Sequence, residues 1–72
     1  MNAISQERLL DMTFKEADKL VRNDGWELKS IKGSHYHYAH PEKSGKVTIP
    51  HHRGDLPKRV INSIKKQAGI KQ

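Results

Sequence analysis

The sequence predicts an α+β fold in which two helices cover one face of a small three-stranded antiparallel sheet. Apolar residues recur at helical spacing in two segments at the ends of this pattern, 13–25 and 55–70. Between them lie three short segments of strand character, 26–31, 35–40 and 46–49, separated by turn residues. Strands this close along the chain are expected to pair as an antiparallel meander. With 72 residues, the chain has room for one domain and a small core.

The first helix is predicted to begin at a capping box formed by Thr13 and Glu16. The Thr13 side chain can accept a hydrogen bond from the backbone of Glu16, whose own side chain can return one to the Thr13 backbone. One apolar stripe follows at helical spacing: Phe14, Ala17, Leu20 and Val21. The helix should end at 23–25, because Gly25 can adopt the left-handed conformation that closes a helix.

Alternation along the first predicted strand places three residues on one face: Trp26, Leu28 and Ser30. Trp26 is expected to anchor the core. Lys32 and Gly33 should turn the chain into the second strand. Turn residues fill 41–45, and the third strand should stop before Pro50.

Histidine and tyrosine alternate along the second predicted strand. One face holds His35, His37 and Ala39. The other face holds Tyr36, Tyr38 and His40. If the helices cover the tyrosine face, the His35 and His37 rings look outward, with their backbones about 7 Å apart. His40 is expected to be a polar group at the strand end.

The second helix is expected to begin at Asp55 or Leu56, with Pro57 in its first turn. Its buried stripe is predicted to be Val60, Ile61, Ile64 and Ala68. Gly69 should end the helix. Four cations fall largely outside the stripe: Lys58, Arg59, Lys65 and Lys66.

Positive charge is concentrated in the second half of the chain. Residues 1–40 hold six Lys or Arg and six Asp or Glu, whereas residues 41–72 hold eight against two, which accounts for the net charge of +6. A basic half on a small domain is typical of a protein that binds polyanions, nucleic acid above all. A merely solubilising surface is the alternative.

Several classes are disfavoured by composition. The chain has no cysteine, so neither disulfides nor thiolate metal sites are possible. No apolar run approaches the roughly 18 residues of a membrane span, and the N-terminus lacks a signal-peptide pattern. We therefore expect a cytoplasmic protein without a membrane contact. Residues 1–12 are interpreted as an N-terminal extension of unclear role, and residues 13–72 as the single domain.

Three chemistries can be considered for the histidine-rich strand. His35 and His37, with His40 or the pair 51–52, could supply three imidazoles to a metal, but their spacing matches no tight ligand motif. Ser34 could act as a nucleophile, but neighbouring side chains on a strand face opposite ways and no clear Asp would orient the histidine. The third chemistry is RNA scission, in which histidine moves protons while Lys or Arg stabilises the charge on phosphate. It requires neither a metal nor a nucleophile from the protein.

Residues 24–69 also resemble the HicA toxins of bacterial and archaeal toxin–antitoxin systems. The resemblance covers about two-thirds of the chain and rests on four motifs: Gly25-Trp26, Gly33-Ser34-His35, Val47-Thr48-Ile49-Pro50-His51 and Lys66-Gln67-Ala68-Gly69. It implies a fold like that of double-stranded-RNA-binding domains, helix–three strands–helix. Many members have three consecutive histidines after the serine, and this sequence departs from them with Tyr36 in the middle.

The resemblance further implies the toxin of a type II system, an endoribonuclease that cleaves messenger RNA and halts growth. Because the chain offers neither a cysteine nor a carboxylate cluster, and attack by a 2′-hydroxyl needs no metal, we expect cleavage to be metal-independent and to need no cofactor. It implies a HicB-type antitoxin as partner, and DNA contact only indirectly through the antitoxin complex. The essential histidine of the family corresponds to His35. Residues expected to contact RNA are Lys32, Ser34, His37, Arg53, Lys58, Arg59, Lys65 and Lys66. The alternatives are a non-catalytic double-stranded-RNA-binding module of the same fold and a metal-binding adaptor built on the histidines.

Overall fold

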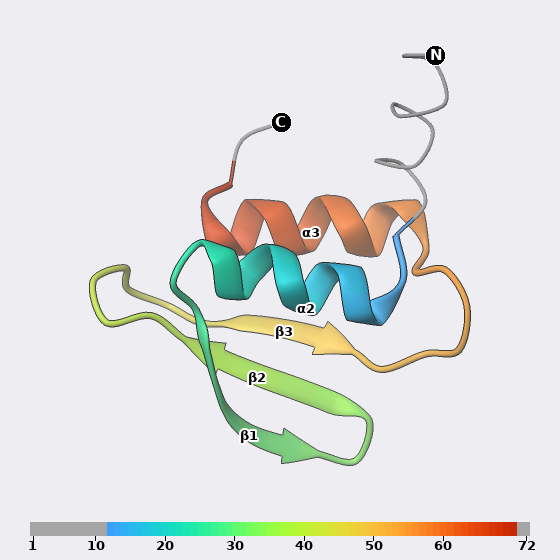
Figure 1. Cartoon of the computed structure of the whole chain (residues 1–72), viewed down its shortest axis with the longest axis horizontal. Helices are drawn as coiled ribbons and strands as arrows, with labels where there is room; N and C mark the ends of the chain where they lie inside the picture. Colours follow the sequence, from blue (N-terminus) through green and yellow to red (C-terminus); the bar gives the residue numbers. More distant parts are fainter. Residues whose placement is uncertain (1–11, 71–72) are drawn as a thin grey trace.

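The computed structural model describes residues 12–70. Its elements follow the order α2 (Phe14–Asn23), β1 (Glu27–Lys32), β2 (His35–Ala39), β3 (Val47–Pro50) and α3 (Lys58–Ala68). The strands form one antiparallel sheet in the order β1-β2-β3. Both helices lie on the same side of this sheet, over β3, while β1 is the strand farthest from them (Figure 1). The predicted α+β architecture is confirmed.

Helix α2 begins and ends as its sequence predicts. Thr13 N donates to Glu16 Oε1 over 3.0 Å, and Glu16 N donates to Thr13 Oγ1 over 3.2 Å, which completes the capping box. Gly25 has a φ of +102° just after the helix. A Cβ at Gly25 would lie 2.7 Å from His40 Nε2, so this position requires glycine for space as well as for conformation.

Helix α3 begins later than predicted, at Lys58 instead of Asp55 or Leu56. Pro57 is its N-cap, with an extended ψ of 146°, and is not part of the first turn. The reason is twofold: a residue before proline is disfavoured in helical conformation, and Leu56 N donates a 2.7 Å bond to the carbonyl of Met12. The helix ends at Gly69, which has a φ of +71°, as predicted.

The sheet departs from strict alternation in β1. Leu28 pairs with Tyr38, but the next pair is Ser30 with His37, so a β-bulge at Lys29 shifts the register. Leu28 therefore faces the helices while Ser30 lies on the opposite face. The prediction that these two residues share a face was wrong, because alternation holds only in the absence of a bulge.

The strand ends also differ by a residue. Strand β1 includes Lys32, so the turn is formed by Gly33 and Ser34. Strand β3 includes Pro50, which pairs with His35, although we expected the strand to stop before it. Proline is tolerated there because β3 is an edge strand, where the missing N–H need not break a ladder.

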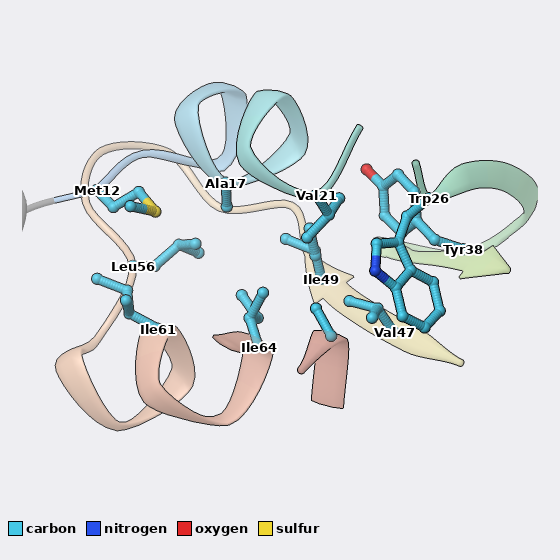
Figure 2. Close-up of a cluster of buried hydrophobic side chains, with 11 residues drawn as sticks. Met12, Ala17, Val21, Trp26, Tyr38, Val47, Ile49, Leu56, Ile61 and Ile64 are labelled. Carbon is cyan, nitrogen blue, oxygen red and sulfur yellow. The ribbon is translucent and has the colours of Figure 1, made fainter. Parts of the chain in front are cut away.

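The core lies between the helices and the sheet (Figure 2). It contains Met12, Ala17, Val21, Trp26, Tyr38, Val47, Ile49, Leu56, Ile61, Ile64 and Ala68. Trp26 is 2% exposed, which confirms it as a core residue. Met12 is the last residue of the predicted N-terminal extension, and residues 1–11 of that extension lie outside the described residues. No helix within residues 12–70 has the length and apolarity needed to cross a membrane.

Candidate functional site

The face of the sheet that the helices leave uncovered carries two histidines. His35 pairs with Lys32 on β1 and Pro50 on β3, and His37 pairs with Ser30 and Thr48. We call this surface the open face. Because Tyr36 and Tyr38 alternate with the histidines and face the helices, the His35 and His37 side chains both project from the open face. Their shared outward direction, predicted from the sequence, is confirmed.

His35 is an exposed side chain at the tip of the β1–β2 hairpin. The two turn residues before it are Gly33 and Ser34, and the positive φ of Gly33, +59°, is the conformation that such tight turns require at their first position. The direct cross-strand neighbour of His35 is Lys32, which is also exposed. The hairpin thus presents an imidazole beside an ammonium group with nothing from residues 12–70 covering either.

The turn before His35 is tied to the loop after β3. His51 N donates a 2.7 Å hydrogen bond to the Ser34 carbonyl, which extends the β2–β3 pairing by one bond. The ring of His51 lies on the helix side, 4.5 Å from the Phe14 ring and 5.5 Å from the Tyr36 ring between centroids. His51 therefore supports the tip of the hairpin from the face opposite His35.

His37 is half-buried and has a fixed partner on the next strand. Its Nδ1 atom lies 3.0 Å from Thr48 Oγ1. The backbone N of Thr48 in turn donates to Gln67 Oε1 of α3 over 3.0 Å, and Gln67 Nε2 donates to Ser63 Oγ over 2.9 Å. Helix α3 thereby reaches around the free edge of β3 and supports the residue that orients the His37 ring.

Sequence reasoning did not identify Thr48 or Gln67 as part of the site. The signal for Thr48 was available, because an antiparallel register places it beside His37 if Val47 and Ile49 face the core. The signal for Gln67 was weaker: it is an uncharged polar residue that follows two lysines on α3 and precedes the buried Ala68. Only the three-dimensional packing of α3 against β3 connects the two residues.

His40 is structural. Its Nε2 atom lies 2.8 Å from the carbonyl of Asp24, and its Nδ1 atom accepts hydrogen bonds from the backbone N of Glu42 and Lys43. Because two N–H groups point at Nδ1, the proton must sit on Nε2 and be donated to Asp24. The ring also packs edge-on against Trp26. The expectation of a polar group at the strand end is confirmed.

The histidines do not assemble into a metal site. Within the part of the chain that the structure describes, no three His, Asp or Glu side chains are grouped so as to hold a metal ion. His40 is engaged with Asp24 at the opposite end of β2, and the His51 ring lies across the sheet from His35.

The predicted cations surround the domain unevenly. Lys32 and Arg53 are exposed in the hairpin and in the loop before α3. Residues seven apart on a helix lie almost directly above each other. Arg59 and Lys66 therefore point together, away from the buried stripe, while Lys58 and Lys65 form a second pair along another flank. Gln67, which contacts β3, lies nearer to the pair of Arg59 and Lys66.

Acidic groups near the helices are paired with cations. Asp18 accepts from Arg22 Nε over 2.9 Å and from the Tyr38 hydroxyl. Lys43 Nζ lies 2.6 Å from Asp24 Oδ2 and also donates to the carbonyl of Ala68 at the end of α3. The hydrogen bond from Lys43 lowers the pKa of Asp24. These carboxylates are therefore neutralised at the end of the domain away from His35.

Comparison with known protein families gave a match over most of the chain. A family model described as the HicA toxin of bacterial toxin–antitoxin systems matches residues 14–70, which is well over half of the chain. The match includes all the elements described above, from the start of α2 to the residue after Gly69. No curated protein matches the chain significantly.

Proposed function

Since the chain belongs to the HicA toxin family of bacterial toxin–antitoxin systems, we propose that it is an endoribonuclease that cleaves messenger RNA. The observation that carries the proposal is the exposed imidazole of His35 on the open face, beside Lys32 and directly after Gly33-Ser34. An imidazole can take up or release a proton near neutral pH, and an adjacent ammonium group attracts phosphate.

In the proposed reaction His35 removes the proton from a 2′-hydroxyl of RNA. The 2′-oxygen attacks the neighbouring phosphorus, the bond from phosphorus to the 5′-oxygen breaks, and that oxygen takes up a proton. Lys32 stabilises the negative charge that accumulates on the phosphoryl oxygens. The RNA supplies its own nucleophile, so no step requires a metal ion or a nucleophilic side chain of the protein.

Binding of RNA is proposed to rest on cations around the site. The net charge of +6 favours association with a polyanion, and Lys32, Arg53, Arg59 and Lys66 are all exposed. Lys58 and Lys65 would extend the same contact along α3. Cations that contact only phosphates position an RNA without reading its sequence, so we expect a relaxed sequence preference.

A toxin of this family requires neutralisation, and we propose a HicB-type antitoxin as the partner. The open face is the surface that such a partner would have to cover, because it carries His35. Contact with DNA would then occur only through the toxin–antitoxin complex. A cytoplasmic location follows from the substrate.

Expression of the chain alone in bacteria tests the function. Induction of the wild type should degrade messenger RNA and arrest growth, whereas induction of His35→Ala should do neither at the same protein level. His52→Ala, which removes an exposed histidine from the loop after β3, is the matched control and should behave like the wild type. Intact RNA in cells that express the folded wild type would instead favour a non-catalytic RNA-binding module.

A further inference from the structure

His37 stands where a second proton-transfer group would be needed. Scission of RNA requires one group to take a proton at the 2′-oxygen and another to deliver one at the 5′-oxygen, on opposite sides of the phosphorus. His35 and His37 project from the same face of β2 with backbones about 7 Å apart. Two imidazoles at this spacing can reach both oxygens of a single phosphodiester lying across the open face.

The contact between His37 and Thr48 suits a ring that changes its protonation state. A hydroxyl can either donate or accept. It can donate to the Nδ1 lone pair of the neutral ring, and after rotation it can accept from Nδ1–H of the cationic ring. The 3.0 Å contact therefore persists in both states and leaves Nε2 free to face the open surface.

His40 provides the contrast within the same chain. Its Nδ1 faces two fixed backbone N–H donors, so a proton on Nδ1 would meet donors on both sides. Backbone donors cannot reverse their direction, so Nδ1 of His40 faces no group that could accept a hydrogen bond from it. Of these two half-buried histidines, only His37 has a partner that allows it to cycle through a proton transfer.

The charged groups around His37 would attract a substrate phosphate to the open face, because the one carboxylate among them is paired with a lysine. The titratable and charged groups on the open face near it are His35 on its own strand, Lys32 beside His35, and Glu27 and Lys29 on β1. Glu27 is bonded to Lys29 over 3.2 Å, and it pairs with Ala39 rather than with His37. On β3 the facing residues are Thr48 and Pro50, and from α3 Gln67 reaches Thr48.

We propose that His37 is the general acid of the ribonuclease reaction, with Thr48 and Gln67 as positioning residues. The inference rests on the proposed function, and it identifies the group that supplies the proton to the 5′-oxygen. His35 takes the 2′-hydroxyl proton, and the 2′-oxygen forms its bond to phosphorus. As the bond between phosphorus and the 5′-oxygen breaks, Nε2–H of cationic His37 protonates the leaving oxygen. The products are a 2′,3′-cyclic phosphate and a 5′-hydroxyl.

A substrate whose leaving atom needs no proton separates the acid from the base. In an RNA with sulfur in place of the 5′-bridging oxygen at one site, the group that leaves phosphorus at that site is a thiolate. The experiment measures single-turnover cleavage of this RNA and of its oxygen counterpart by full-length wild type, His35→Ala, His37→Ala, Thr48→Val and Thr48→Ser. Circular dichroism and thermal unfolding establish that each variant is folded.

For the oxygen substrate, His37→Ala should lower the cleavage rate by about 10²-fold or more, which is the usual contribution of a general acid. The remaining activity should still be measurable. For the sulfur substrate, the cleavage rate of the same variant should fall by less than about tenfold. It should also lose the basic limb of the pH–rate profile, which reports the acid. Thr48→Val should share this pattern more weakly, and Thr48→Ser, which keeps the hydroxyl, should restore wild-type behaviour.

The proposed function and the inference fail in different ways. Suppose that the wild type cleaves, that His35→Ala does not, and that His37→Ala lowers the cleavage rate equally on both substrates. His37 is then not the general acid, although the ribonuclease assignment stands. A His37→Ala variant that retains the basic limb of the profile would overturn the inference in the same manner. If the folded wild type cleaves neither substrate, the ribonuclease proposal itself falls.

Discussion

The hydroxyl of Tyr38 on β2 donates a hydrogen bond to the carboxylate of Asp18 on α2. Tyr38 is 1% exposed, and its ring lies at the Trp26 end of the core (Figure 2). The bond ties the centre of the histidine strand to the helix layer. Because neighbouring residues of a strand face opposite ways, anchoring Tyr38 inward directs His37 outward. The structural contact thus sets the direction of the candidate catalytic ring.

Removing this hydroxyl should destabilise the domain without removing its chemistry. Tyr38→Phe leaves the ring in place but deprives the partly exposed Asp18 carboxylate of one donor, with Arg22 remaining. We expect a loss of about 1–2 kcal/mol in the free energy of unfolding, measured in urea. Tyr36→Phe is the matched control and should change stability less. Equal losses in the two variants would show that the Asp18 bond adds little.

The same residue predicts a loss of stability in alkali. Burial in the first place, and then the bond to Asp18, raise the pKa of Tyr38 above its ordinary value of 10.0. The neutral phenol is therefore favoured in the folded state, and its contribution is complete below pH 10. As the pH rises above 10, the unfolded state ionises first, so stability should fall. Urea unfolding between pH 9 and pH 11 should show a weaker decline in Tyr38→Phe, and an identical decline would contradict the assignment.

Gly25 should tolerate no side chain. Gly25→Ala places a methyl group 2.7 Å from His40 Nε2 at a φ of +102°, so it combines backbone strain with a collision. Gly54→Ala is the matched control, since Gly54 also has a positive φ, +71°, but nothing within 4 Å of its Cβ position. The control should cost about 1 kcal/mol and Gly25→Ala clearly more. Thermal unfolding of both variants measures the difference, and equal costs would mean that His40 moves aside freely.

The two cation pairs of α3 should contribute differently to RNA binding. In a His35→Ala background, Arg59→Gln with Lys66→Gln should flatten the slope of log affinity against log salt by about 1.4 for single-stranded RNA, if each cation meets one phosphate. The double variant Lys58→Gln with Lys65→Gln removes the same charge from another flank and should flatten it less. Equal effects would instead support the contact along the whole helix that the sequence suggested.

Cleavage should persist in a chelator, because the proposed reaction has no step that uses a metal. Replacing the scissile 2′-hydroxyl by hydrogen should abolish cleavage at that position, since the nucleophile is then absent. Both results are read on a labelled RNA of defined sequence, with magnesium added back as the control. A requirement for added metal, or equal cleavage of the deoxy substrate, would refute the mechanism.

Much of the fold could be predicted because local signals agreed with one another. The Thr13–Glu16 capping box, the stop at Gly69 and the alternation of His35 to Ala39 each depend on neighbouring residues, and all three are confirmed. The errors arose where distant residues decide the outcome. The bond from Leu56 to Met12 and the bulge at Lys29 arise from tertiary pairing that local patterns do not encode.

Part of the candidate site could also be predicted from the sequence. The shared face of His35 and His37 follows from alternation alone, whereas the support of His37 by Thr48 and Gln67 depends on a strand register and a helix docking. The difference between His37 and His40 also needed the structure, because it depends on whether a hydroxyl or a backbone N–H faces the ring.

Single-turnover cleavage by purified protein, with analysis of the product ends, tests the central claim most directly. The wild type should convert a defined RNA to fragments that end in a 2′,3′-cyclic phosphate and begin with a 5′-hydroxyl. His35→Ala should be folded, bind RNA with nearly unchanged affinity and salt dependence, and cleave at least about 10²-fold more slowly. A folded His35→Ala variant that cleaves at the wild-type rate would contradict the assignment of His35 as the catalytic base.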